Sequence, residues 1–267
     1  MKKRTIIFSL AVTILSLTLG FIIWNEVITD QKVALRYEPV AFNTQAEPNI
    51  NVEDIPDFFY SIGTRFAVIK KTDIDKARSI NDFLPLKQTQ KIENYKSVKV
   101  IILDDSKQTD LRETGNTATL NAAQIKLLQS TKHSTNILIR ADYQEKNKDT
   151  NELQDGYSTP YLTIVPEKQA VYVNGMDALI NYLKENSKEK TTIVQKDKLQ
   201  PGKLYFTVNK KGNIVNAKIT ATSGYPSIDK MMIDLITKAP GQWESANNYK
   251  GEKVDQELVF SFGIIGC

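Results

Sequence analysis

A run of twenty residues without a charge, from Thr5 to Trp24, places the strongest constraint on what this chain can form. At a rise of about 1.5 Å per residue, a helix of this length spans roughly 30 Å, the thickness of a bilayer core. A cleaved signal peptide has a shorter apolar core, of about 7–15 residues, followed by small residues at the cleavage site. This run instead ends in bulky side chains, so we expect residues 1–24 to be a cytoplasmic stub and a transmembrane anchor, with a signal peptide as the alternative.

The charges around this segment predict its orientation. Lys2, Lys3 and Arg4 precede it, and the first acidic residue is Glu26, so the positive-inside rule places the N-terminus in the cytoplasm and the rest of the chain outside it. The same three residues account for most of the formal net charge of +4, and the remainder holds 32 basic against 31 acidic residues. That balance gives no reason to expect a nucleic-acid partner.

Four small residues are spaced along one stripe of the predicted anchor. Ser9, Thr13, Ser16 and Gly20 lie 4, 3 and 4 residues apart, so a second helix could approach closely there. We therefore consider them a candidate transmembrane seam. The alternative is a chance alignment, because Ser and Thr are common in membrane helices.

Residue types that carry catalysis are scarce. Cys267 is the only cysteine, which excludes an intrachain disulfide and a cysteine-based metal site, and His133 is the only histidine, in a polar stretch typical of a surface turn. The adjacent carboxylates of Asp104 and Asp105 would point to opposite faces of a strand. The sequence has no phosphate-binding glycine loop and no nucleophile elbow, so we expect no enzyme, no catalytic residue, no metal and no cofactor.

After the anchor, the chain divides into a linker and two folded units. Residues 25–57 contain three prolines and little periodicity, as is typical of a linker, and residues 58–167 predict an α+β unit of unknown family. In that unit the predicted helices cover residues 72–84 and 121–130, and the predicted strands cover residues 97–105, 135–143 and 160–165.

The last hundred residues have the clearest pattern. An amphipathic helix is predicted over Gly175–Asn186, a β-hairpin over Lys203–Gly224, a second helix over Ser227–Lys238 with Ser227 as its cap, and a strand over Glu252–Gly263. The order is helix, hairpin, helix and strand.

This ordered set, over about residues 168–264, resembles the C-terminal domain of the TonB family in its Bacteroidetes-type form. The resemblance implies that residues 168–267 form a three-stranded antiparallel sheet packed by two helices. Trp243 matches the tryptophan that follows the second helix and leads into the loop before the last strand. The expected fold class is thus α+β: a transmembrane helix, an unassigned α+β unit and a TonB-like C-terminal domain.

The resemblance also implies a mechanical function. TonB proteins take energy from the proton gradient through an ExbB/ExbD complex of the inner membrane, and their periplasmic domain binds the TonB box of outer-membrane receptors by adding it as a strand at a sheet edge. The edge implied here is Glu252–Gly263. The candidate partner-binding residues are Trp243, Tyr249, Val254, Gln256, Val259 and Ser261.

Departures from the family leave an alternative function open. The segment Thr5–Trp24 lacks the histidine that the family's anchor commonly bears, and a folded unit of about 110 residues stands where a long Pro/Lys-rich spacer is usual. The alternative is a membrane-anchored envelope adaptor that binds partners through a TonB-like domain without transmitting energy.

Overall fold

The computed structural model describes residues 58–265. The predicted anchor, its seam of small residues, the linker and Cys267 lie outside the described residues. Within residues 58–265, no helix is both long enough and apolar enough to cross a membrane.

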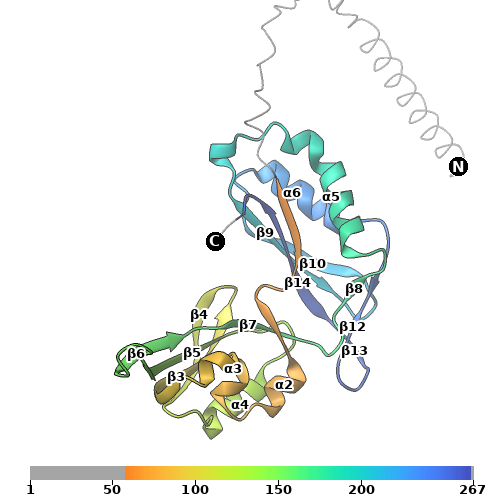
Figure 1. Ribbon diagram of the computed structural model, residues 1–267. Helices are drawn as coiled ribbons and strands as arrows, with labels where there is room; N and C mark the ends of the chain where they lie inside the picture. Colours follow the sequence, from red (N-terminus) through yellow and green to blue (C-terminus); the bar gives the residue numbers. More distant parts are fainter. Residues whose placement is uncertain (1–57, 266–267) are drawn as a thin grey trace, which may run out of the picture. The chain divides into compact units, whose positions relative to one another are not determined.

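The strands of the structure are β1 (Phe59–Gly63), β2 (Ala67–Lys70), β3 (Ile92–Asp104), β4 (Lys107–Gly115), β5 (Asn136–Lys146), β6 (Leu153–Ser158), β7 (Tyr161–Val165), β8 (Val171–Tyr172), β9 (Pro201–Val208), β10 (Ile214–Ala221), β11 (Trp243–Glu244), β12 (Ala246–Asn247), β13 (Lys253–Val254) and β14 (Gln256–Gly263). The helices are α2 (Lys71–Lys76), η2 (Ile80–Phe83), α3 (Leu86–Thr89), α4 (Ala122–Ser130), α5 (Met176–Thr191), η3 (Lys196–Lys198) and α6 (Pro226–Thr237). Figure 1 shows how these elements follow one another.

A six-stranded sheet is built from one continuous stretch of chain. Its order is β2-β7-β5-β3-β4, with β6 paired to the second half of β5. The pair β2 and β7 is parallel, and the other pairs are antiparallel. One face is covered by α2, η2 and α4, whose buried side chains pack with those of β3 and β5 in one core.

The helix α4 illustrates how this core is fixed. Asn121 caps it, with its side chain accepting from the backbone of Gln124 while the Gln124 side chain accepts from the backbone of Asn121. The Gln124 amide also donates to the carbonyl of Val98 at 3.0 Å, so a buried polar side chain joins the helix to β3.

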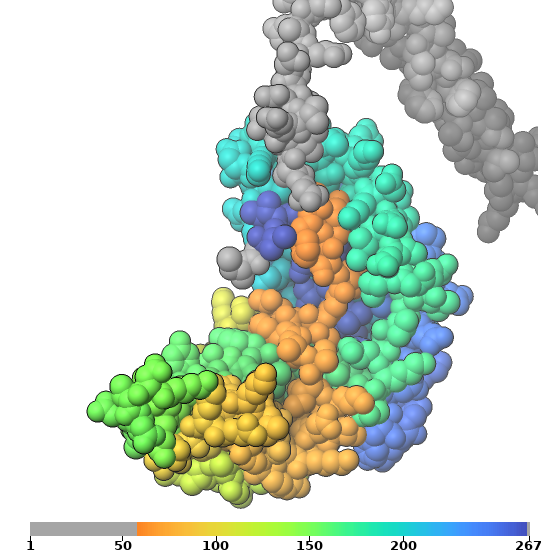
Figure 2. Space-filling model, in the orientation of Figure 1, coloured from red at the N-terminus to blue at the C-terminus, as the bar shows by residue number. Residues whose placement is uncertain are grey.

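A four-stranded antiparallel sheet is assembled from two distant stretches of chain. Its order is β1-β14-β9-β10, and β1 comes from before the six-stranded sheet whereas the other three strands come after it. Tyr60 of β1 lies opposite Phe262 of β14, and its hydroxyl shares a hydrogen bond of 2.5 Å with Ser187 of α5. Figure 2 shows the orange atoms of this segment at the surface beside the green atoms of α5.

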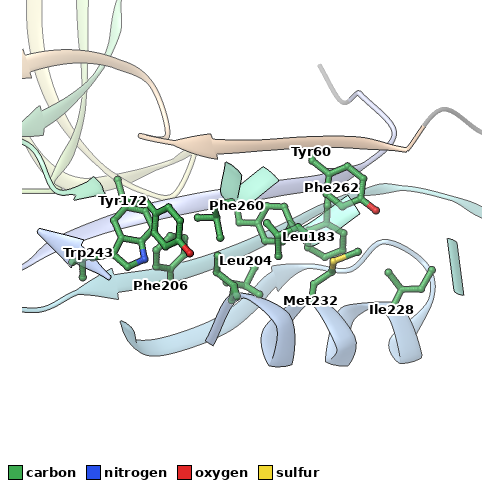
Figure 3. Close-up of a cluster of buried hydrophobic side chains, with 14 of the residues drawn as sticks. Tyr60, Tyr172, Leu183, Leu204, Phe206, Ile228, Met232, Trp243, Phe260 and Phe262 are labelled. Carbon is green, nitrogen blue, oxygen red and sulfur yellow. The ribbon is translucent and has the colours of Figure 1, made fainter. Parts of the chain in front are cut away.

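The helices α5 and α6 pack on one face of the four-stranded sheet. Alternate residues of β9 and β14 point to this face, among them Phe206, Phe260 and Phe262, which are fully buried. Met232 of α6 points toward them (Figure 3). Alternation on the strands and helical spacing on α6 thus enclose one apolar core.

These findings correct the expected fold. The C-terminal sheet has four strands and not three, because Phe59–Gly63, which lies in the range predicted to belong to the first unit, pairs along β14. The described chain is also richer in strands than expected. Both β4 and β6 lie in segments for which no strand was predicted, since these strands expose polar side chains.

The start of α6 also differs from the prediction. Pro226 is the first residue of the helix, so Ser227 lies inside it and does not cap it. The carboxylate of Asp229 instead accepts from the Thr222 hydroxyl at 2.5 Å and from the Ser223 backbone at 2.9 Å. Asp229 therefore ties the end of the hairpin to the helix that follows.

Asp105 joins the two sheets, which belong to one compact unit. It lies in the turn after β3 with a φ of 53°, and its carboxylate accepts from Arg65 at 2.9 Å and from the Tyr205 hydroxyl of β9. Burial alone would raise the pKa of Asp105, but the hydrogen bond from Tyr205, the charge of Lys203 and the contact with Arg65 outweigh it and lower that pKa. Burial and the same carboxylate raise the pKa of Tyr205.

Candidate partner-binding surface

The strand that was expected to offer a free edge is paired on both sides. Val259 of β14 lies opposite Gly63 of β1 and Tyr205 of β9, and Ser261 lies opposite Ser61 and Lys203 in the same way. The expectation of an unpaired edge at Glu252–Gly263 is therefore wrong for this structure. Along Val259–Gly263, the strand positions that an added strand would occupy are already taken by β1.

Two further candidate residues, Gln256 and Val254, differ in burial. Gln256 is buried, with its side-chain oxygen accepting from the Ala170 backbone at 2.7 Å and its amide donating to Gln169 at 3.0 Å. It therefore holds the segment that leads into β8, which is a structural role. Val254 is half-buried at the end of β13 and packs against the apolar core.

Trp243, another of the candidate partner-binding residues, is buried and only 7% exposed. Its indole packs edge-to-face against the rings of Tyr172 and Phe206, with centroid distances of 5.4 and 5.8 Å (Figure 3). The buried indole nitrogen finds no hydrogen-bond acceptor among the described residues. Trp243 thus supports the surface from within.

The turn between β9 and β10 packs directly on the backbone of Trp243. Gly212 has a φ of +79°, and a Cβ added there would lie 2.2 Å from the Trp243 carbonyl oxygen. Glycine is required at this position both by the left-handed backbone and by the close approach. As a result, the neighbouring Lys211 is held beside Trp243.

Tyr249 is the exposed aromatic residue of the region. It lies between β12 and β13, which pair as a short hairpin, and 64% of it is accessible. The Asn248 side chain fixes this turn by accepting from the backbone of Lys250 and of Glu252, each at 3.0 Å. We name residues 246–254 the Tyr249 hairpin.

A hollow of about 310 Å³, which we name the basic hollow, lies against this hairpin. It is lined by Lys168, Lys211, Trp243, Glu244, Ser245, Asn247 and Lys253. Lys168 forms an ion pair of 3.1 Å with Glu244, the single carboxylate in the lining. Lysines from three separate segments therefore converge above Trp243.

A second hollow, of about 460 Å³, has Tyr249 in its wall. The other lining residues are Thr72, Asp75, Lys76 and Glu167. Glu167 accepts from Lys70 and from Thr72, each at 2.8 Å. Tyr249 therefore borders one hollow, while the strands of its hairpin contribute Asn247 and Lys253 to the other.

Of the six predicted residues, only Tyr249 is exposed. The sequence analysis did not predict the lysines of the basic hollow as site residues, because they lie far apart in the sequence and form no local motif. No protein-family model, curated protein or solved structure matches the chain.

Proposed function

We propose that the protein is a membrane-anchored adaptor of the cell envelope that holds a partner protein through the Tyr249 hairpin. The observation that carries the proposal is an exposed tyrosine on an ordered hairpin between two hollows. The envelope location rests on the predicted anchor Thr5–Trp24 and on the charges before it.

The chemistry of the hairpin suits protein binding. Tyrosine is enriched among residues that contribute most to interfaces, because its ring offers apolar area and its hydroxyl a hydrogen bond. The Asn248 hydrogen bonds hold the turn before any partner arrives, which reduces the entropy lost on binding. The ammonium nitrogen of Lys250 lies 5.6 Å from the centroid of the Tyr249 ring, over one of its faces.

The test compares two tyrosines of similar exposure in the full-length protein. Tyr249→Ala removes the proposed contact, whereas Tyr157→Ala removes a tyrosine of the six-stranded sheet that is 67% exposed. We expect proteins crosslinked in intact cells to the wild type and to the Tyr157→Ala variant to be missing or at least tenfold weaker with Tyr249→Ala. Equal recovery by all three proteins would exclude the hairpin as the partner site.

A second candidate is the energy transducer that the TonB resemblance implies. A specific observation favours it: β14 accepts an extended segment from a distant part of the chain, in the form of β1. A receptor segment could take this place only after β1 leaves, which would expose Phe58 and Tyr60 and break the hydrogen bond to Ser187. This cost makes the adaptor our first proposal.

The register of β1 and β14 offers a test that separates the two candidates. Ser61 and Ser261 lie directly opposite each other, so cysteines at both positions, with Cys267→Ser, can form a disulfide that locks β1 in place. An exchange mechanism predicts that oxidation stops receptor-dependent uptake and that a reductant restores it. The adaptor predicts that partner crosslinking is the same in both states. Co-purification with an ExbB/ExbD-type complex would further support the transducer.

A further inference from the structure

We propose that the basic hollow binds a carboxylate side chain of the partner, so that the adaptor selects an acidic segment. The inference rests on the proposed function, because it names the chemistry of what docks beside the Tyr249 hairpin.

The lysines are brought together by backbone pairing. Lys168 and Asn247 exchange two backbone hydrogen bonds, of 3.0 and 2.8 Å, and Asn247 lies opposite Lys253 in the hairpin. Lys211 is placed by its turn, in which Asn209 accepts from the Lys211 backbone at 2.9 Å. Their convergence is therefore a property of the fold and not of a flexible tail.

The lining has an excess of positive charge. Glu244 is the single carboxylate there and is already paired with Lys168. Within residues 58–265, Lys211 and Lys253 form no ion pair. Two ammonium groups around one hollow attract an anion, and an anion bound between them reduces their mutual repulsion.

The size and position of the hollow favour a side chain of a bound protein. About 310 Å³ is at the lower end of the range for ligand sites, which is sufficient for a carboxylate-bearing side chain with water. Ser245 and Asn247 add neutral polar groups to the lining. Because Asn247 and Lys253 belong to the Tyr249 hairpin, a segment that contacts Tyr249 has the hollow within reach.

The first experiment uses isothermal titration calorimetry and tryptophan fluorescence on the full-length protein carrying Trp24→Phe, so that Trp243 is its single tryptophan. The probes are a capped tetraglutamate peptide, a capped tetraglutamine peptide and inorganic phosphate. We expect tetraglutamate to bind, to weaken as salt is added and to shift the Trp243 emission, with no binding of tetraglutamine. Tighter binding of phosphate than of tetraglutamate would overturn the assignment to a carboxylate.

Substitutions of the lysines that line the hollow are compared with that of a neighbouring lysine outside it. Lys211→Ala and Lys253→Ala should each weaken tetraglutamate binding about three- to fivefold, as expected for a partly exposed charge contact. Lys210→Ala removes the same charge from a residue outside the lining and should change binding less than twofold. Glu244→Gln removes the competing carboxylate and should strengthen binding two- to fourfold.

The outcomes distinguish this inference from the proposed function. Absence of tetraglutamate binding, or equal effects of Lys211→Ala and Lys210→Ala, would overturn the carboxylate site and leave the Tyr249 hairpin to its own test. Partner crosslinking that survives Lys211→Ala with Lys253→Ala would also overturn it. If tetraglutamate binding depends on these lysines but the partner is unaffected by Tyr249→Ala, the adaptor proposal fails and the anion site stands.

Discussion

The two sheets of this protein are assembled in opposite ways. The six-stranded sheet uses one continuous stretch, from Ala67 to Val165, whereas the four-stranded sheet needs β1 to pair with β14, about 200 residues later. Pairing over such a separation carries a larger loop-closure entropy and is slower to form. All strands of the six-stranded sheet come from residues 67–165. The four-stranded sheet, in contrast, takes β1 from outside the predicted C-terminal domain, residues 168–267.

The largest expected effect comes from separating the two sheets. A fragment of residues 66–166 retains all six strands and should show the dispersed amide signals of a folded protein. A fragment of residues 168–267 lacks β1 and leaves the aromatic side chains under it exposed. Burying Phe58 and Tyr60 is worth about 1.5–3 kcal/mol each, so losing both removes a large part of the roughly 5–15 kcal/mol by which a domain is stable. We expect this fragment to be unfolded or to melt far below the full-length protein.

A peptide control decides whether β1 is the cause. Adding a synthetic peptide of residues 56–65 to fragment 168–267 should raise its melting temperature, because the peptide restores the pairing along β14. A peptide with Tyr60→Ala should do so less well. If fragment 168–267 is equally stable without either peptide, the dependence on a distant strand is wrong.

Single substitutions at Tyr60 of β1 in the full-length protein should have a smaller effect. Tyr60→Ala removes a buried ring that packs near Phe260, and we expect a loss of about 3–5 kcal/mol in the free energy of unfolding. Tyr60→Phe keeps the ring and removes its hydrogen bond to Ser187, so its cost should be about 1 kcal/mol. Urea unfolding measures both. Similar losses in the two variants would show that the hydrogen bond, and not the burial, holds β1.

The contact between the sheets should have a weaker and pH-dependent effect. Asp105→Asn removes the charge that accepts from Arg65 and Tyr205, and we expect it to cost about 1–2 kcal/mol near neutral pH. The folded-state pKa of Asp105 is lowered, so its contribution is present above the unfolded pKa of about 3.9 and is lost as the pH falls through the folded value. The wild type and the variant should therefore converge in acid. A constant difference down to pH 2 would rule out this titration.

The same contrast explains what could be predicted from the sequence. The strand β9 and the helix α6 could be predicted because each buries an apolar face of its own. The signals were the alternation of Leu204, Phe206 and Val208 and the helical spacing of apolar residues in α6. The strands β4 and β6 could not be predicted from the sequence, because most of their side chains are polar and exposed. They are held by backbone pairing with β3 and β5. No local pattern in Phe59–Gly63 indicates which of the two sheets it joins.

In the candidate site, too, features with a local sequence pattern could be predicted, and those that depend on distant segments could not. Tyr249 was identified because it lies in the loop that precedes a well-patterned strand, whereas Trp243 was identified from the family resemblance. Val259 and Ser261 were misjudged because the position of an edge depends on every strand of the sheet, including β1. Lys168 was missed because its neighbour in the structure is Asn247, almost 80 residues away in the chain.

The smallest expected effect lies at the surface of the six-stranded sheet, at the only histidine. His133 is half-buried, and burial together with the charge of Lys71 lowers its pKa, although Asp75 opposes this. A lowered folded-state pKa means that the contribution of His133 to stability is present above the unfolded value of about 6.5 and is lost as the pH falls through the lower folded value. His133→Asn should therefore make the urea midpoint less sensitive to pH between 5 and 7. Since no other histidine titrates in this range, an unchanged pH dependence in the variant would show that His133 has the same pKa in the folded and unfolded states.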